Sequence, residues 1–424
     1  MTDMIYPNHK DLYRLPWSLN ESPIGWVEVT DVCNIHCEGC YRLNKSGHKT
    51  LDEIKDEILF LKKWRKCDTV TLAGGEAILH PEIVDIVMFV KQNGMKSMII
   101  TNGVALNVKL LTKLKESGLT GVSFHIDSTQ NRPELKNKKN ISELDLNAVR
   151  LHYAKLVADV GGLTTTFGIT VDPENINDIP LFINWAINNI NYVNTLTFIT
   201  YRGMPVSSDI DYFANGEKVE LKKNSLGYAV SEEDFDKINI KSQDVYSTIK
   251  KHFPYYNVNS YLGGTHNHKS IKWLIGNIIL NSKGKMFGSI GNRVMELVQT
   301  FYHYKTGRYF VHFKKQRFGK KIFLFALVDK KVRKTFTEFC RYILIHPLLL
   351  FSPLKSLNIG IVQPPDFSAD GTVDMCDGCP DMCVYEGKLI NSCRLDECLN
   401  FGSFIRFYIK DKKLASQLSK TYDV

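Results

Sequence analysis

The chain has 424 residues, 44% hydrophobic and 23% charged, the composition of an ordinary globular protein with room for two or three domains. No apolar run reaches the roughly 18 residues of a membrane-spanning helix, and the first residues lack the features of a secretion signal, so we expect a cytoplasmic protein. Ten cysteines in such a chain indicate metal or redox chemistry before disulfides. The formal charge of +9 is uneven, because residues 301–360 carry most of the excess of Lys and Arg.

The first half of the chain alternates predicted strands with predicted helices. A strand is expected over residues 25–30, and Thr50 and Glu53 form a capping box that opens a helix reaching about residue 66. The pattern then predicts strands over 69–73, 95–101, 120–126, 163–171 and 194–201, with helices over 81–94, 108–117, 143–159 and 176–190 between them. Strands that alternate with helices form parallel sheets. We therefore expect an α/β fold, a partial (β/α)6 barrel with too few units to close.

The rest of the chain divides by composition. The expected segments are an N-terminal segment over residues 1–20, the barrel over 21–205, a covering region over 206–370, a cysteine-rich region over 371–400 and a tail over 401–424. The polar stretch 131–140 is expected to be a surface loop. His266 and His268 are expected in a loop and not as metal ligands, because no further metal-binding partner is evident.

Residues 301–360 combine a local net charge of +11 with 13 aromatic residues. The apolar runs 321–328 and 342–351 are too short to span a bilayer, but they suit a segment that lies on a membrane while its lysines attract anionic lipid. The same composition suits nucleic-acid binding by stacked aromatics, or a buried lid with a basic rim. Long apolar runs favour lipid over nucleic acid, since stacked bases need isolated aromatics. We therefore expect peripheral membrane contact, with the lid as the alternative.

Three cysteines with the spacing CxxxCxxC follow the first predicted strand: Cys33, Cys37 and Cys40. Three thiolates hold three irons of a [4Fe–4S] cube and leave the fourth iron open to a small molecule, for which S-adenosylmethionine is the candidate. The alternative is a zinc knuckle. Zinc sites usually pair CxxC with a second CxxC or with two histidines, and although His36 lies in the loop, nothing nearby completes a tetrahedral set. The spacing therefore favours the cluster.

The tripeptide Gly74-Gly75-Glu76 ends the next predicted strand, where such folds place their sites. Its glycines allow close approach of the backbone to a ligand, and its carboxylate offers a partner for an ammonium group. Together with the cysteines and the segments 99–103 and 122–128, this motif resembles the radical S-adenosylmethionine (radical SAM) superfamily over roughly residues 20–205. The resemblance implies a partial barrel, a [4Fe–4S] cluster and reductive cleavage of S-adenosylmethionine to a 5′-deoxyadenosyl radical.

The chain departs from the family pattern at two positions. Gly39 stands where an aromatic residue usually precedes the third cysteine, and Ala77 stands where a proline usually follows the glutamate. Neither change removes a ligand. Tyr41 is the candidate for the side chain that stacks on the adenine.

Four further polar residues are candidates for contact with the cofactor or substrate. Asn102 ends a strand at the same face of the barrel as the cysteines, and the alternative is an ordinary turn asparagine. Ser123, His125 and Asp127 alternate onto one face of their strand. A polar run inside a barrel needs a function, so we expect at least one of them to face inward.

The second cysteine group contains Cys376, Cys379, Cys383, Cys393 and Cys398. Such a C-terminal extension resembles the auxiliary-cluster (SPASM-like) regions of the same superfamily and implies a second [4Fe–4S] cluster. Mononuclear iron or zinc is the alternative, because thiolate ligands suit all three. The expected ligands are the first four cysteines, with Cys398 as the spare. Cys67 and Cys340 stand apart and are expected to be packed or incidental thiols.

The sequence as a whole predicts a radical SAM enzyme that abstracts hydrogen from an apolar or lipid-like substrate. A peptide or protein substrate is the first alternative, and a non-catalytic iron–sulfur electron carrier or zinc-bearing binding protein is the alternative of another class. The resemblance also implies an electron donor such as flavodoxin or ferredoxin. Nucleic acid is not expected as a partner.

Overall fold

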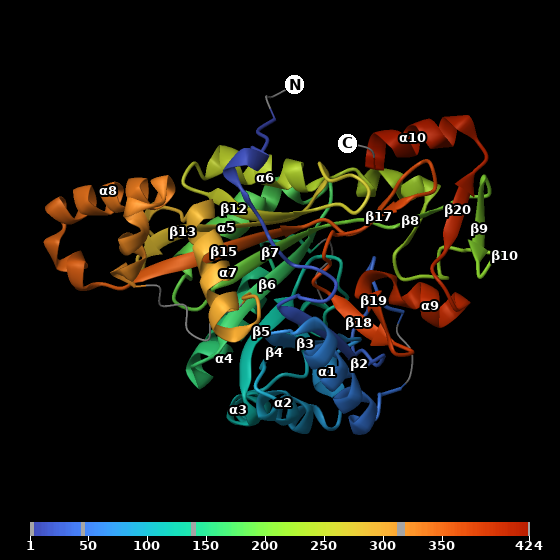
Figure 1. Ribbon diagram of the computed structural model, residues 1–424, viewed down its shortest axis with the longest axis horizontal. Coiled ribbons are helices and arrows are strands. Elements are labelled where there is room, and N and C mark those ends of the chain that lie inside the picture. The colour runs from blue at the N-terminus through green and yellow to red at the C-terminus, as the bar shows by residue number, and fades with distance from the viewer. Residues whose placement is uncertain (1–3, 44–46, 137–140, 312–318, 423–424) are drawn as a thin grey trace.

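The structure is a computed structural model, and it describes residues 4–43, 47–136, 141–311 and 319–422 (Figure 1). Its centre is a sheet in which six parallel strands follow the order β7-β6-β5-β4-β3-β2. They are β2 (Ile24–Thr30), β3 (Thr69–Gly74), β4 (Lys96–Thr101), β5 (Leu119–His125), β6 (Thr164–Val171) and β7 (Thr195–Thr200). The predicted α/β fold with six parallel strands in a partial barrel is confirmed.

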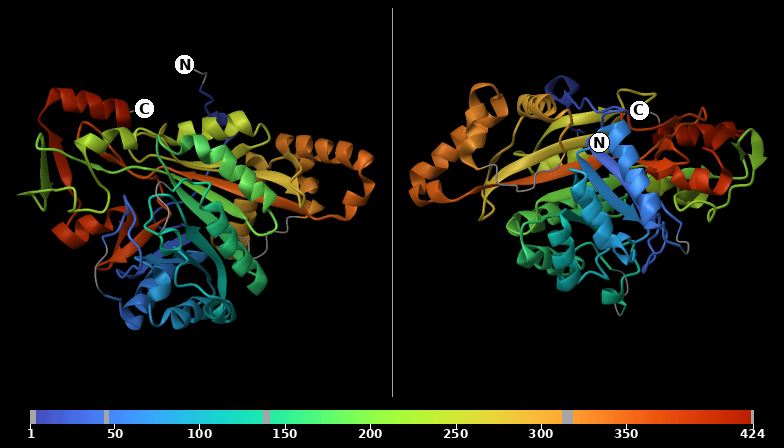
Figure 2. Two further views of the ribbon diagram at one scale, coloured as in Figure 1. Left: turned by 180° about the vertical axis from the view of Figure 1, so that it is seen from behind. Right: turned by 60° about the horizontal axis from the view of Figure 1, so that its bottom comes forward.

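Helices connect these strands and pack their apolar faces against the sheet in the main hydrophobic core (Figure 2). They are α1 (Leu51–Arg65), α2 (Ile83–Gln92), α3 (Val108–Ser117), α4 (Asn147–Val160) and α5 (Ile179–Asn188), with the short 3-10 helices η2 (Ala77–Leu79), η3 (Pro133–Leu135) and η4 (Ile176–Asp178). Thr50 and Glu53 form the predicted capping box at the start of α1. Gly118 ends α3 in the left-handed conformation.

The sheet continues past β7 with strands that come from other parts of the chain. β15 (Leu354–Val362) pairs parallel to β7, and β13 (Ile271–Asn281), β12 (Asn257–Gly263) and β1 (Tyr13–Arg14) follow it in that order. β14 (Met286–Gly288) pairs with β13, and α6 (Ser242–His252) packs against β13 and β15. Residues 354–362 overlap the end of the predicted basic segment, but they form a central strand because alternate side chains are buried.

Helices form most of the rest of the basic segment where the structure describes it. They are α7 (Asn292–Thr306), η6 (Lys320–Leu327), α8 (Lys330–Ile345) and η7 (Pro347–Phe351). Figure 1 shows α8 at the left of the molecule and α7 nearer its middle. Ile322 and Phe339 are buried in a small core of this region, whereas Leu324, Leu344 and Leu348 are exposed. Each predicted apolar run is therefore divided between a packed face and an exposed face.

The C-terminal part folds back onto the barrel. β18 (Met382–Tyr385) pairs with β19 (Lys388–Asn391) and packs against β2 and α1. The other elements are η1 (His9–Asp11), β8 (Met204–Val206), β9 (Ile210–Ala214), β10 (Glu217–Val219), β11 (Ala229–Ser231), η5 (Glu232–Ile238), β16 (Asp366–Phe367), β17 (Val373–Asp374), η8 (Ser392–Arg394), α9 (Leu395–Phe401), β20 (Arg406–Ile409) and α10 (Lys412–Tyr422). Within the described ranges, none of the helices combines the length and apolar character needed to cross a membrane.

Candidate active site

The loop that follows β2 carries Cys33, Cys37 and Cys40, and all three line one cavity of about 310 Å³. The loop that follows β5 holds it in place. Cys37 forms an isolated β-bridge with Gln130, and the backbone N–H of Glu38 donates to the carbonyl of Thr129 at 3.1 Å. Three thiols that face one space from one loop are the donor set that a cube with one open iron requires.

Burial raises the pKa of each of these thiols, to about 11 for Cys40. Without a metal the three thiols are therefore protonated near neutral pH. Because metal ligands must be thiolates, loading of the site releases protons. What fits the three thiols to an iron–sulfur cluster is their position around one cavity, because the raised pKa values by themselves oppose thiolate formation.

Gly39 has a φ of +67°, and a Cβ at this position would meet the ring of Tyr201 at 2.2 Å. Tyr201 follows β7 and lines the same cavity. The absence of a side chain at Gly39 thus makes room for an aromatic ring from the far side of the barrel. An aromatic ring from a distant residue therefore lies next to the position before the third cysteine.

The Gly74-Gly75-Glu76 turn contacts the cysteine loop directly. The N–H of Gly75 donates to Thr30 O at 2.7 Å, and the N–H of Glu76 donates to Val32 O at 2.8 Å. The close approach expected of the two glycines is therefore first of all to the cysteine loop, although both also line the cavity.

Glu76 lies in the cavity wall and is 1% exposed. One of its carboxylate oxygens accepts from the N–H of Asn102 at 2.6 Å, and the other accepts from the N–H of Ile78 at 3.3 Å. Burial raises the pKa of Glu76 to about 7. A buried carboxylate with backbone donors but without a counter-charge in its direct hydrogen bonds suits a ligand that brings a cation.

Asn102 also lines the cavity and connects Glu76 to the cysteine loop. Its side-chain amide donates to Asn34 Oδ1 at 2.7 Å and lies 3.9 Å from Cys33 Sγ. The buried guanidinium of Arg132 donates to the carbonyl of Asn102 at 2.9 Å and to the side chain of Gln130. The sequence predicts a surface loop over 131–140, but Arg132 is buried, where its guanidinium contacts this wall. Residues 137–140 lie outside the described residues.

His125 lies in the cavity wall. Its Nε2 is 2.8 Å from Asp127 Oδ2 and 3.2 Å from Thr170 Oγ1. Burial alone would lower the pKa of His125, but the Asp127 carboxylate raises it and in turn is held well below its usual pKa. Ser123 is partly buried on β5 and is not among the residues that line this cavity.

Tyr41 lines the cavity, and both its hydroxyl and its ring have contacts. Its hydroxyl donates to Glu28 at 3.1 Å, and its ring packs edge-on against Trp26. Next to it, Arg42 is buried and pairs with Asp31 and Asp396. The Arg42–Asp396 pair joins the first cysteine loop to α9, which carries Cys398 of the second cysteine group.

The second cysteine group contributes Cys376, Cys379 and Cys393 to the same cavity, together with Asp381. A thiol hydrogen bond joins Cys376 and Cys379, and it lowers the pKa of Cys379. Cys383 lies on β18 with its Sγ 3.4 Å from Ile390 O, and Cys398 lies on α9; neither is among the residues that line the cavity. In the described ranges, no three His, Cys, Asp or Glu side chains are arranged to hold a single metal ion.

A buried arginine and a buried charge network support the second group. Arg65 of α1 donates to the carbonyls of Cys379 at 2.8 Å and Pro380 at 3.3 Å. Ahead of Cys376, Asp374 accepts from the N–H of His266 at 2.7 Å and lies 3.3 Å from the buried ammonium of Lys272. His266 is thus in a loop, as predicted, where its backbone anchors the strand that leads into the cysteines.

Several residues of the cavity wall had no signal in the sequence. The side chains that complete the wall without having been predicted include Trp26, Ile199, Tyr201, Tyr228, Trp273 and Phe367. They come from β2, β7, β13 and the segments before the second cysteine group. A sequence pattern identifies them only as core residues, because their meeting depends on the sheet order.

The comparisons with known proteins agree with this geometry. Residues 27–186 match the family model described as the radical SAM superfamily. The chain is 26% identical over 200 residues to a 7,8-dihydro-6-hydroxymethylpterin dimethyltransferase of Methanocaldococcus jannaschii, covering 45% of this chain and 37% of that protein. It is 28% identical over 175 residues to the tungsten-containing aldehyde ferredoxin oxidoreductase cofactor-modifying protein of Pyrococcus furiosus, covering 38% and 48%. The matches thus span less than half the length of these two relatives.

Among solved structures, Streptococcus suis SuiB bound to S-adenosylmethionine matches with 12% identity and a TM-score of 0.35, covering 44% of this chain and 42% of that one. The structure titled native anSMEcpe with bound AdoMet matches with 14% identity and a TM-score of 0.36, covering 55% and 59%.

Proposed function

Residues 27–186 belong to the radical SAM superfamily, and on that premise we propose that this protein reductively cleaves S-adenosylmethionine at a [4Fe–4S] cluster held by Cys33, Cys37 and Cys40. The observation that carries the proposal is that these thiols and the buried Glu76 line one cavity. The cluster and cofactor supply one-electron cleavage of the sulfonium and hydrogen abstraction by a 5′-deoxyadenosyl radical. The chain supplies binding, orientation and exclusion of water.

The residues around the cysteines divide these tasks. Glu76 binds the ammonium group of S-adenosylmethionine, and Asn102 holds Glu76 through its backbone N–H. Tyr41 and Tyr201 are the two aromatic candidates for contact with the adenine, and Tyr201 has the advantage that it packs directly over Gly39. His125, paired with Asp127, places in the wall an imidazole whose pKa the carboxylate raises.

The second cysteine group fits an auxiliary [4Fe–4S] cluster. Cys376, Cys379 and Cys393 face the cavity together, so they are the cysteines that would hold it. The fourth ligand is Asp381 if it comes from the cavity wall. It is Cys383 if the segment that carries β18 rearranges when the cluster is inserted. Mononuclear iron or zinc remains the alternative that metal analysis distinguishes.

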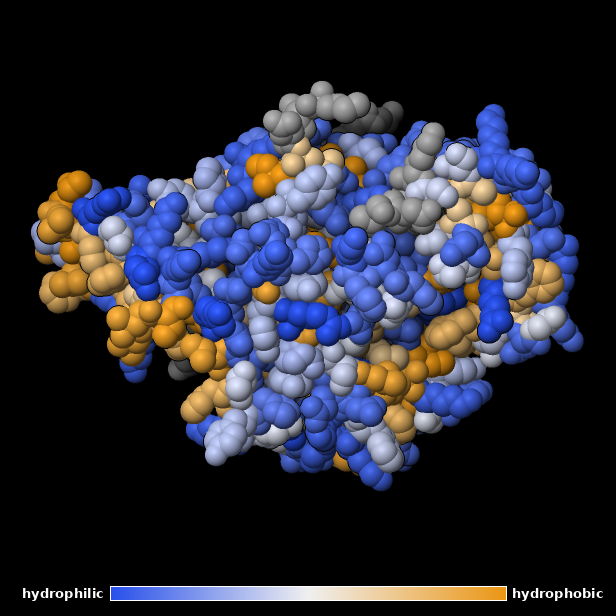
Figure 3. All heavy atoms as spheres, turned by 45° about the horizontal axis from the view of Figure 1, so that its top comes forward, coloured by the Kyte–Doolittle hydropathy of each residue, from blue (hydrophilic) through white to orange (hydrophobic). Residues whose placement is uncertain are grey.

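An apolar or lipid-like substrate agrees best with the cavity and the surface. Much of the cavity wall is aromatic or aliphatic, including Trp26, Ile199, Tyr228, Trp273, Val362 and Phe367. Figure 3 shows hydrophobic side chains gathered at the end of the molecule where Figure 1 places α8. There Leu344, Ile345, Leu348 and Phe351 are 74–85% exposed, and Lys330, Arg333 and Lys334 are exposed in the first turns of α8, at the other end of the helix. This combination suits contact with an anionic membrane.

The test of the reaction is anaerobic reconstitution with iron and sulfide, reduction with dithionite and measurement of 5′-deoxyadenosine. Formation of 5′-deoxyadenosine in the wild type and its loss in Cys33→Ala support the proposal. A reconstituted protein that carries clusters but forms none would be an electron carrier and not an enzyme.

Co-sedimentation with neutral and anionic vesicles tests the surface. We expect binding to anionic vesicles that weakens in Leu344→Ser/Leu348→Ser and at high salt, because both apolar insertion and charge contribute. Competition by single-stranded RNA would favour the nucleic-acid interpretation instead. Lys314 and Lys315 also carry charge in this segment but lie outside the described residues.

A further inference from the structure

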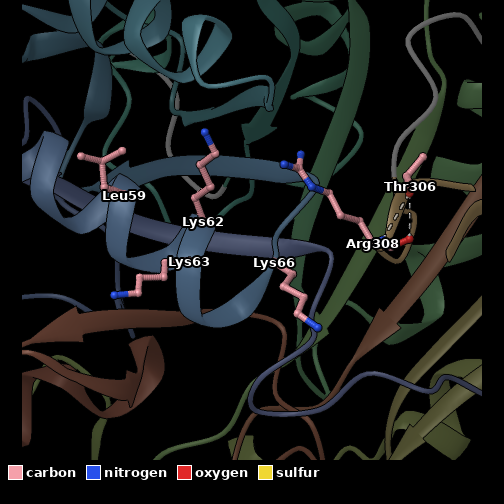
Figure 4. Close-up of a pocket in the computed structure, with 7 residues that line it drawn as sticks. Leu59, Lys62, Lys63, Lys66, Thr306 and Arg308 are labelled. Carbon is pink, nitrogen blue, oxygen red and sulfur yellow. Dashed lines mark hydrogen bonds between the residues drawn. The ribbon is translucent and has the colours of Figure 1, made fainter.

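A basic hollow of about 540 Å³ lies on the outer surface, where the ends of α1 and α7 meet (Figure 4). Its wall contains four cationic side chains, Lys62, Lys63, Lys66 and Arg308, together with Leu59 and Thr306. Among the described residues that line it, none is acidic. The hollow therefore presents positive charge to whatever binds there.

The hydrogen-bond partners of these cations leave most of the charge uncompensated. Lys62 Nζ donates to Asn93 Oδ1 at 3.1 Å, and Arg308 Nη1 donates to the carbonyl of Gly94 at 3.1 Å. Lys63 Nζ lies 4.8 Å from the centroid of the Trp64 ring. These partners are neutral, whereas Lys66 pairs with Glu21.

Buried contacts fix the walls of the hollow. Tyr302, in the last turns of α7, donates its hydroxyl to Asp68 Oδ1 at 2.7 Å, and Lys96 donates to the other oxygen of Asp68 at 2.7 Å. Asp68 directly precedes β3 and Lys96 begins β4. The end of α7 is thus attached to the start of two barrel strands, so the hollow is formed before any partner arrives.

The second cysteine group lies directly behind this surface. Arg65 belongs to the same last turn of α1 as Lys62 and Lys63, but its side chain is fully buried and points inward. Its guanidinium donates to the carbonyl of Cys379 at 2.8 Å. One side chain therefore connects the basic surface to the turn that carries Cys376 and Cys379, and those cysteines share the cavity of the first group.

From this juxtaposition we infer that the hollow is the docking site of an acidic one-electron carrier protein, which reduces the metal centre at Cys376, Cys379 and Cys393. The inference rests on the proposed function, because it assumes an iron–sulfur cluster at these cysteines. In each encounter the carrier loses one electron and the cluster gains one, and no atom is transferred. Carboxylates on the carrier meet Lys62, Lys63 and Arg308, so that the charge steers the encounter.

The experiment compares Lys62→Glu/Lys63→Glu with a matched control, Lys113→Glu/Lys115→Glu. The control changes two lysines in the last turns of α3, where the cost of acidic residues near a helix C-terminus is similar. Two properties of the reconstituted protein are measured at low ionic strength: its affinity for an acidic ferredoxin and the rate at which the reduced ferredoxin reduces its clusters. We expect both to fall by about tenfold or more in the first variant and to stay near the wild-type values in the control.

Dithionite serves as the small reductant that needs no docking site. The rate of reduction by dithionite should be the same in the wild type and in both variants. The rate of reduction by ferredoxin should fall with added salt more steeply in the wild type than in Lys62→Glu/Lys63→Glu. Equal loss in the test and control variants, or an unchanged ferredoxin affinity in Lys62→Glu/Lys63→Glu, would overturn the inference. If the charge-reversal variant Lys62→Glu/Lys63→Glu folds poorly, Lys62→Gln/Lys63→Gln replaces it and should show a smaller loss of ferredoxin affinity and of the ferredoxin reduction rate. Failure to form 5′-deoxyadenosine even with dithionite would refute the proposed function, while the binding measurement would still decide the docking site.

Discussion

The two cysteine groups use the same four-residue turn in different surroundings. Cys37-Glu38-Gly39-Cys40 and Cys376-Asp377-Gly378-Cys379 share the pattern of cysteine, acid, glycine and cysteine, and both glycines have a φ of +67°. In the first turn the glycine faces the movable ring of Tyr201. In the second it faces a backbone carbonyl, Trp17 O, at 2.1 Å from where a Cβ would be.

The charges around the two turns differ as well. Arg42, just after the first turn, pairs with carboxylates, whereas Arg65, beside the second, donates to backbone carbonyls. Nearby carboxylates accordingly raise the pKa of Arg42 although its burial opposes this, while burial lowers the pKa of Arg65. The two buried arginines therefore differ in their partners, which are carboxylates for Arg42 and backbone carbonyls for Arg65.

The largest expected effect separates the two groups by function. Cys33→Ala, Cys37→Ala or Cys40→Ala should each abolish 5′-deoxyadenosine formation, because two thiolates do not hold a cube with one open iron. Cys376→Ala/Cys379→Ala should instead lower the iron content from about eight to about four atoms per chain and leave the first cluster visible by electron paramagnetic resonance. Retained product in Cys33→Ala, or stoichiometric zinc in the native protein, would contradict these assignments.

The two arginines should differ in their contribution to stability. Arg42→Met leaves the buried carboxylate of Asp396 without its partner and should cost about 3–5 kcal/mol in the free energy of unfolding. Arg65→Met leaves carbonyls unpaired and should cost less, about 1–3 kcal/mol. Urea unfolding of both variants checks the order. A larger loss in Arg65→Met would show that the contact with Cys379 does more than satisfy carbonyls.

Gly39 and Gly378 should differ in how much an alanine substitution lowers stability and iron content. Gly378→Ala should lower stability and iron content more than Gly39→Ala, because a carbonyl fixed in the backbone cannot move aside as a tyrosine ring can. Both substitutions share the cost of about 1 kcal/mol for a left-handed non-glycine residue. Tyr201→Ala should restore the iron content of Gly39→Ala. Equal losses in the two alanine variants would mean that the surroundings of the turns do not matter.

The smallest expected effect concerns cofactor binding at the first group alone. Because burial raises the pKa of Glu76 to about 7, the carboxylate becomes protonated as the pH falls through this value. The affinity for S-adenosylmethionine should therefore fall by about tenfold between pH 8 and pH 6. Glu76→Gln should bind more weakly at pH 8 and lose this pH dependence while keeping its cluster absorption. A pH dependence that persists in Glu76→Gln would assign it to another group.

Much of the barrel and both cysteine groups follow from local signals. Alternation of strand and helix patterns predicted the six parallel strands, and the capping box at Thr50 and Glu53 placed the start of α1. Cysteine spacing alone predicted both groups as candidate metal ligands, because closely spaced cysteines on one loop can face one metal centre. The same local signals predicted Glu76 and Asn102 at the strand ends where the structure has them.

Only the tertiary structure decided how these parts meet. Arg42 and Asp396 are 354 positions apart in sequence, yet they join the two cysteine groups across one cavity. Tyr201 reaches the wall because the sheet order places the end of β7 across the barrel from β2, and Trp273 reaches it because β15 and β13 extend the sheet beyond β7. Cys383, although spaced like a ligand, lies on β18, and none of the residues of this strand lines the cavity. Periodicity and spacing determine local structure, whereas the packing of distant segments determines which of these residues share a site.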